Sequence, residues 1–145
     1  MALVEKLVLV GYSAEQMYTL VNDVERYPQF LPWCSGTQVE HRDPAVTRAA
    51  ISVDYRGFKT SFRTENLTRP PELIEIRLVS GPFRNLDGTW RFVALSAAAC
   101  RIDFRLHYEF SSKLLERPAA PVFGYIANSL VDAFVKRAEK LYGEG

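Results

Sequence analysis

Strict alternation of apolar and polar side chains in residues 100–110 constrains the fold of this chain more than any other feature. The apolar positions are Cys100, Ile102, Phe104, Leu106, Tyr108 and Phe110. Charged residues and one histidine, from Arg101 to Glu109, occupy the positions between them. Because successive side chains of a strand point to opposite faces, this pattern predicts a strand with one buried face and one wet face. Such strands are typical of antiparallel sheets.

The same period of two recurs from about residue 36 to residue 110. Residues 49–56, 59–65 and 74–78 alternate in this way, and a dense apolar run over residues 2–10 predicts a strand that precedes them. Turn-forming pairs separate the runs at Asp43-Pro44, Pro70-Pro71 and Gly81-Pro82. The sequence therefore predicts an antiparallel sheet of about six or seven strands.

Two helices are expected at the ends of this sheet. Ser13 and Gln16 have the spacing of a capping box, which predicts that a helix begins after Ser13. Pro118 and Pro121 mark the expected entry to a long C-terminal helix, and Gly143 ends it. Its apolar stripe consists of Phe123, Ile126, Ala127, Leu130, Phe134, Ala138 and Leu141. One helix that buries a stripe against one sheet is an α+β arrangement, so we expect a single domain over residues 1–145.

Charge and cysteine content restrict the class of protein. The formal net charge of +1 over 145 residues lacks the broad positive field of a dedicated DNA-binding protein. No apolar run approaches the roughly 20 residues that span a bilayer, and the first residues do not have the pattern of a signal peptide. Cys34 and Cys100 are far apart and unclustered, which favours a reduced, cytoplasmic protein.

A short segment over residues 22–34 combines aromatic residues with two prolines. Tyr27, Phe30 and Trp33 are interleaved with Pro28 and Pro32, so the segment cannot continue as a long regular helix. It is too apolar for an ordinary solvated loop. We expect a bent element that closes over either the protein core or a ligand.

Catalytic patterns are scarce. The sequence contains no nucleophile elbow, phosphate-binding loop, paired-cysteine motif or zinc-protease motif, and its only histidines are His41 and His107. The inward positions of the alternating strands contain no Asp, Glu, His or Lys. General acid–base catalysis needs a positioned titrating group, so we expect a protein that is not an enzyme, with no catalytic residue and no metal site. The apolar inner faces fit either a solid core or an apolar cavity.

Three segments are similar to a known superfamily. They are residues 23–34 (DVERYPQFLPWC), residues 81–92 (GPFRNLDGTWRF) and residues 126–134 (IANSLVDAF). Through them the chain resembles the START-like superfamily, also called SRPBCC or polyketide cyclase/dehydrase. Within it, the chain is similar to the branch of RatA ribosome-association toxins and coenzyme Q-binding proteins. The resemblance implies a helix-grip (Bet v-like) fold, in which a curved sheet surrounds the C-terminal helix and leaves a cavity between them.

The resemblance also implies a function and a site. It implies binding of ubiquinone or another isoprenoid lipid in support of respiration, with no required cofactor. We expect a quinone ring near Trp33 or Trp90, a hydrogen bond from Tyr55, Tyr108 or a threonine, and a tail along the long helix. The candidate ligand-binding residues are Phe30, Trp33, Tyr55, Phe62, Trp90, Phe92, Phe104, Tyr108, Phe123, Leu130 and Phe134.

Two alternatives remain open. A translation inhibitor of the RatA type would bind the large ribosomal subunit through its surface, and the run Arg56, Lys59, Arg63 and Arg69 is the candidate feature. A solvated sheet face explains the same run. A cyclase-like enzyme is less favoured, because the inner faces lack acid–base groups. Transient membrane contact is expected at most.

Overall fold

A computed structural model describes residues 2–143 of the chain. The elements follow in the order strand, helix, short 3-10 helix, six strands and long helix. The strands are β1 (Ala2–Val10), β2 (Cys34–Arg42), β3 (Val46–Tyr55), β4 (Phe58–Arg69), β5 (Leu73–Ser80), β6 (Phe83–Ser96) and β7 (Ala99–Phe110). The helices are α1 (Ala14–Asn22), the 3-10 helix η1 (Val24–Gln29) and α2 (Lys113–Tyr142).

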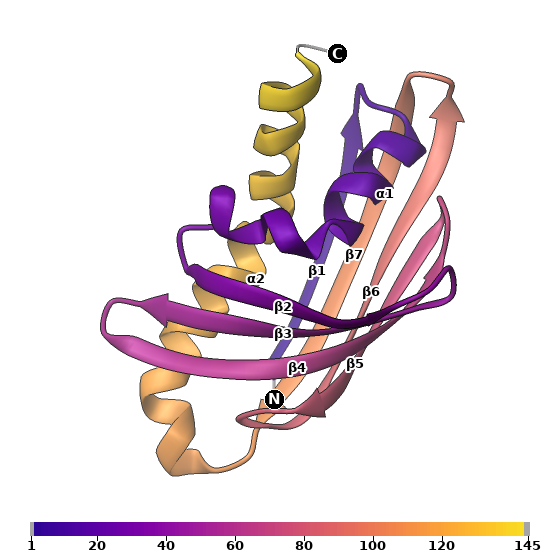
Figure 1. Ribbon diagram of the computed structural model, residues 1–145. Coiled ribbons are helices and arrows are strands. Elements are labelled where there is room, and N and C mark those ends of the chain that lie inside the picture. Colours follow the sequence, from indigo (N-terminus) through magenta and orange to yellow (C-terminus); the bar gives the residue numbers. More distant parts are fainter. Residues whose placement is uncertain (1, 144–145) are drawn as a thin grey trace.

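All seven strands form one antiparallel sheet in the order β1-β7-β6-β5-β4-β3-β2. Strands β2, β3 and β4 cross in front of α2, whereas β1, β7 and β6 run beside it, so the sheet curves around the helix (Figure 1). Helix α1 and η1 lie at the same side of the sheet as α2 (Figure 1). This arrangement confirms the predicted helix-grip fold.

Local sequence accounts for the junctions between elements. Ser13 accepts a hydrogen bond from the Gln16 backbone amide and donates its own backbone amide to the Gln16 side chain, so the expected capping box is present. Arg56 and Gly57 both have positive φ, at 50° and 83°. Two consecutive positive φ angles are typical of the tight turns that suit the twist of a β-hairpin, and here they join β3 to β4.

The start of α2 differs from the prediction. The helix begins at Lys113, where the Ser112 side chain accepts a hydrogen bond from the backbone amide of Leu115. Pro118 and Pro121 therefore lie inside the helix rather than at its entry. Both prolines are exposed. Their rings occupy the wet side of the helix, where the carbonyl groups they leave unpaired can bond to water.

The interior of the molecule is the space between the concave face of the sheet and α2. Phe123, Ile126, Ala127, Phe134 and Ala138 of the predicted stripe are buried there. Leu130 is partly buried, and Leu141 is half exposed, so the buried stripe ends before the last turn. Within residues 2–143, no helix is long and apolar enough to cross a bilayer.

Candidate functional site

A cavity of about 90 Å³ lies between the inner face of the sheet and α2. It receives side chains from seven of the strands and helices (β3 to β7, η1 and α2) as well as from the segment between η1 and β2. Its walls are mainly aromatic and aliphatic. They are formed by Val24, Tyr27, Trp33, Ile51, Phe62, Thr64, Asn66, Ile76, Phe83, Leu86, Trp90, Phe104, Leu106, Tyr108, Phe123, Ile126, Leu130 and Phe134.

Eight of the eleven residues that the sequence singled out lie in this wall. They are Trp33, Phe62, Trp90, Phe104, Tyr108, Phe123, Leu130 and Phe134. Alternation explains why the strand residues among them meet, because Trp90 and Phe104 are register partners on β6 and β7. Their ring centroids are 4.4 Å apart. Contact of these eight residues with a ligand remains a prediction.

The other three residues lie outside the cavity wall. Phe92 is buried under α1, with its ring 6.0 Å from that of Tyr18. Tyr55 stacks on Tyr125 of α2, with centroids 4.9 Å apart and planes 3° from parallel. Phe30 packs against Phe134 at 5.3 Å but lines a neighbouring groove instead of the cavity.

The bent segment forms part of the cavity wall as η1 and the residues that follow it. Pro28 lies within η1, where the tighter 3-10 turn replaces a regular helix. Tyr27 points inward, and its hydroxyl donates to the backbone carbonyl of Val21 at 2.5 Å. Burial raises the pKa of Tyr27, so this hydroxyl stays protonated. Tyr27 thus combines an apolar ring toward Phe134 with a satisfied polar tip.

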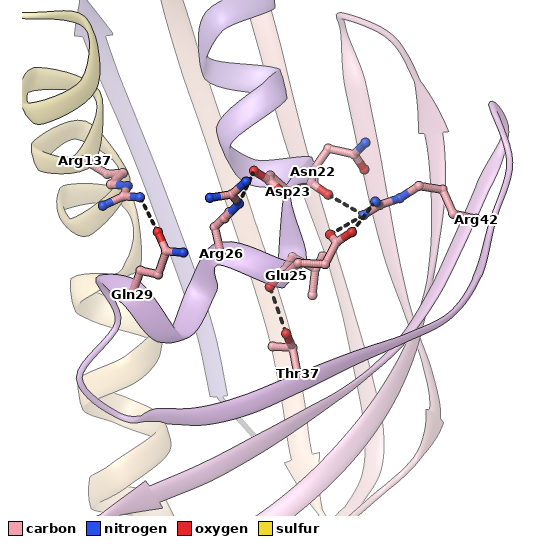
Figure 2. Close-up of polar contacts among 9 residues, drawn as sticks. Asn22, Asp23, Glu25, Arg26, Gln29, Thr37, Arg42 and Arg137 are labelled. Atoms are coloured by element: carbon pink, nitrogen blue, oxygen red, sulfur yellow. Dashed lines mark hydrogen bonds and ion pairs between the residues drawn. The ribbon is translucent and has the colours of Figure 1, made fainter.

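Polar contacts hold η1 at both ends (Figure 2). Arg42 of β2 donates to both carboxylate oxygens of Glu25, at 2.7 and 2.8 Å, and to the backbone carbonyl of Asn22 at 3.1 Å. At the other end, Arg137 of α2 donates to the Gln29 side chain at 2.8 Å. The hydrogen bonds from Arg42 lower the pKa of Glu25, so the pair stays ionised at neutral pH. The segment is therefore connected to both the sheet and the long helix.

A groove of about 290 Å³ lies on the outer side of this segment. Residues 30–33 form one side of it, and α2 forms the other. Trp33 lines both the groove and the cavity, so the two spaces adjoin at this residue. Lys136, Arg137 and Lys140 give the groove a cationic side, although Asp132 pairs with Lys136 at 3.1 Å.

The polar groups of the cavity wall are few. Thr64 and Tyr108 contribute hydroxyls, and burial raises the pKa of Tyr108. Asn66 contributes an amide whose Oδ1 is buried and has no hydrogen-bond partner within the described residues. The cavity wall, as far as residues 2–143 form it, contains no carboxylate, imidazole, amine or guanidinium. It can bind an apolar molecule and hydrogen-bond to it, but it offers no acid or base of ordinary pKa.

The predicted ligand-binding residues lack ten of the eighteen wall residues, and Val24, Tyr27 and Asn66 are the instructive ones among them. Asn66 continues the inward set of β4 after Thr60, Phe62 and Thr64, so extending the alternation by one step would have found it. Val24 and Tyr27 enter through η1, whose 3-10 geometry has no comparable period.

The candidate ribosome-binding cations are partly neutralised by neighbours on the outer face of the sheet. Lys59 lies 3.9 Å from Asp54, and Arg63 lies 3.2 Å from Glu40. Among the described residues, no carboxylate lies within ion-pair distance of Arg56 or Arg69. Within the same range, no group of three or more His, Cys, Asp or Glu residues is arranged to hold a metal ion.

Comparison with known proteins identifies the family. A family model described as polyketide cyclase / dehydrase and lipid transport matches residues 10–135. The chain belongs to this family. Over 141 residues it is 44% identical to a protein of Vibrio cholerae named ribosome association toxin RatA, covering 97% of this chain and 98% of the relative. It is also 33% identical over 139 residues to a Xenopus laevis protein named coenzyme Q-binding protein COQ10 homolog B, mitochondrial, covering 93% of this chain and 57% of that protein.

Solved structures of other proteins superpose on this chain over nearly its whole length. A START superfamily protein from Mycobacterium smegmatis superposes with a TM-score of 0.78 at 26% identity, covering 96% of this chain and 98% of that one. The Zhui aromatase/cyclase from Streptomyces sp. R1128 superposes with a TM-score of 0.84 at 16% identity, covering 99% of both chains. At this low identity the cyclase shares the fold alone. The predicted membership of the START-like superfamily is confirmed.

Proposed function

We propose that the chain binds a small apolar molecule of the isoprenoid quinone class in the cavity, without chemical conversion. The observation that carries this proposal is the wall itself, which joins aromatic rings and aliphatic chains to a few neutral hydrogen-bonding groups. Ligand sites for apolar molecules have this composition. The relative named as a coenzyme Q-binding protein supports the choice of a quinone. A role in supporting respiration would follow from binding of a respiratory quinone.

The size of the cavity adds a requirement to this proposal. Pockets that bury a drug-sized ligand measure roughly 300–1,000 Å³, whereas this cavity measures about 90 Å³. A quinone ring with even a short tail therefore has to push its walls apart. The wall between the sheet and α2 is the one that can widen without breaking the sheet's hydrogen bonds. Binding should thus be coupled to an outward movement of α2 or of residues 24–33.

Leu130 and Leu114 offer a matched test on one helix. Leu130 lines the cavity, whereas Leu114 is 87% exposed at the start of the helix. Leu130→Phe fills part of the space, so it should weaken the binding of a decyl-substituted ubiquinone by at least about tenfold. Leu114→Phe should leave the affinity unchanged. Isothermal titration calorimetry measures both, and absence of binding by the unmodified protein would refute the proposal.

Association with the large ribosomal subunit is a second candidate function. Its support is the identity of 44% to a protein named ribosome association toxin over nearly the whole chain. Arg56 and Arg69 supply the unneutralised cations that ribosomal RNA attracts. Such an activity would use the outer surface, so it is compatible with a ligand in the interior.

Charge reversal separates the exterior function from the interior one. Arg69→Glu should reduce co-sedimentation with purified large subunits in sucrose gradients, because a phosphate contact is replaced by repulsion. Its quinone affinity should equal that of the unmodified protein. Arg101→Glu is a suitable control, because Arg101 already pairs with Asp103 on β7, outside the predicted basic run. Equal loss in both variants would mean that net charge, not this surface, governs the association.

A further inference from the structure

The groove between residues 30–33 and α2 combines aromatic rings with cations. Its lining includes Phe30, Trp33, Tyr125, Lys136, Arg137 and Lys140. Asp132 is the one carboxylate in the lining, and it pairs with Lys136 at 3.1 Å, so the groove keeps a net positive charge. Proteins that bind single-stranded nucleic acid place aromatic stacking surfaces beside cations that attract the phosphate backbone. The groove offers both kinds of group.

Tyr125 is held in place by a stack and is still open to the groove. Tyr55 covers one face of the Tyr125 ring, with centroids 4.9 Å apart and planes 3° from parallel. The guanidinium of Arg56 lies 5.4 Å from the centroid of the Tyr55 ring, within reach of a cation–π contact. Tyr125 nevertheless remains 41% exposed and lines the groove. A ring fixed in this way loses little conformational freedom when a planar base stacks on it.

Two of the groove cations keep their charge available to an anion. Arg137 donates to the side chain of Gln29 at 2.8 Å (Figure 2) and lies 5.0 Å from the centroid of the Phe30 ring. Both of these partners are neutral. Lys140 is exposed, and no carboxylate of residues 2–143 lies within ion-pair distance of Lys140 or Arg137. Neutralisation of phosphates by such cations is the main source of affinity for nucleic acids.

The dimensions of the groove favour a polymer over a mononucleotide or a bilayer. A rise of 1.5 Å per residue places Tyr125 about 18 Å from Arg137 along α2, so only a strand of several nucleotides reaches from the ring to the cations. Leu31 and Trp33, the largest apolar residues of the lining after the two exposed rings, are recessed, at 1% and 4% exposed. A membrane-binding surface instead presents apolar side chains that enter the acyl region.

We propose that this groove binds single-stranded RNA, with a base stacked on Tyr125 and phosphates of the same strand on Arg137 and Lys140. RNA presents unpaired bases of this kind in its loops and bulges. The proposal deepens the second candidate function and rests on it, because the groove would be a contact surface for the RNA of the large ribosomal subunit. This surface lies along α2, apart from Arg69 at the end of β4.

Fluorescence anisotropy tests the stacking contact. The probe is a fluorescein-labelled, unstructured RNA of about twelve alternating adenosine and cytidine nucleotides. Tyr125→Ala should weaken its binding by about tenfold, whereas Tyr125→Phe keeps the ring and should bind like the unmodified protein. Tyr142→Ala is the matched control, since Tyr142 is 38% exposed on the same helix but does not line the groove. Unchanged binding by Tyr125→Ala, or an equal loss in the control, would overturn the inference.

Charge reversal on α2 tests the phosphate contact. Lys140→Glu should weaken binding of the same RNA by about tenfold, lower the slope of its salt dependence by about one, and reduce co-sedimentation with purified large subunits. Lys113→Glu makes the same change of charge on α2 outside the groove and should leave all three unchanged. Equal losses in the two variants would mean that net charge, rather than the groove, attracts RNA.

Three further results separate this inference from the function on which it rests. An unmodified protein that binds neither the RNA probe nor the large subunit would overturn both. Co-sedimentation that survives in Tyr125→Ala and Lys140→Glu would overturn the groove assignment alone. Binding to vesicles of phosphatidylglycerol and phosphatidylcholine that is lost in Lys140→Glu, with no binding of RNA, would identify an anionic bilayer as the occupant instead.

Discussion

Gly88 and Gly124 are two glycines whose replacement by alanine should have opposite effects on stability. A Cβ atom at Gly88 would lie 2.9 Å from the backbone oxygen of Arg105 and 3.0 Å from Leu106. Backbone on the neighbouring strand cannot move cheaply, so Gly88→Ala should cost about 1–3 kcal/mol. At Gly124, inside α2, nothing lies within 4 Å of the added carbon. Gly124→Ala should therefore stabilise by about 0.5–1 kcal/mol, the helix-propensity difference.

Urea denaturation followed by circular dichroism measures both changes. The two variants add the same single carbon, so the contrast isolates the local space around each glycine. A neutral effect of Gly88→Ala would show that β6 and β7 can separate at this point. That result would also imply a softer cavity wall, because the register neighbours Trp90 and Phe104 belong to the same pair of strands.

Helix α2 carries two prolines that local rules alone would exclude from it. Pro118 cannot donate to the carbonyl of Leu114, which in a regular helix would accept its amide hydrogen. Pro118 and Leu114 are both exposed. Pro118→Ala therefore adds this hydrogen bond without changing the core. We expect urea denaturation to show a stabilisation of about 1–3 kcal/mol. The upper end is the roughly 3 kcal/mol by which proline is less favourable than alanine in a helix interior. A loss of stability would show that the proline stiffens this turn in a way the helix needs.

The elements differ in how well sequence predicts them. The alternation in β7 identifies both the strand and its inward face, because burial repeats every second residue. The prolines of α2 mislead because the Ser112 cap and the stripe from Phe123 onward stabilise a helix that includes them. Asn66 lies one step beyond the alternating run of residues 59–65, and its neutral amide carries no charge that would mark it as a site residue. The place of Trp33 between cavity and groove depends on tertiary packing, which no local pattern in residues 22–34 encodes.

The whole molecule separates an apolar interior from a charged exterior. Ion pairs cross the outer face of the sheet, as between Arg48 and Glu65 at 2.7 Å and between Arg63 and Glu40. The cavity wall has none of these groups within the described residues. A ligand inside and a macromolecular partner outside would therefore bind through different residues. The same chain can in this way be related to one protein named for the ribosome and another named for coenzyme Q.

Passage of a ligand between exterior and interior depends on contacts that join the sheet to α2. The stack of Tyr55 on Tyr125 is such a contact, and Tyr125 also lines the groove next to Trp33. Tyr125→Ala removes the stack but no part of the cavity wall. We expect it to raise the association and dissociation rates of decyl-substituted ubiquinone together, by a few-fold each, with little change in Kd. The stack has to open for a ligand to pass, so its loss lowers the barrier to passage in both directions.

Stopped-flow measurements of tryptophan quenching follow these rates, since Trp33 and Trp90 both line the cavity. Tyr142→Ala is the matched control, because Tyr142 is a similarly exposed tyrosine of α2 that contacts Tyr12 instead. The control should leave both rates unchanged. A change in Kd without a change in association rate would place Tyr125 among the ligand contacts. Unchanged rates in Tyr125→Ala would mean that the ligand enters elsewhere.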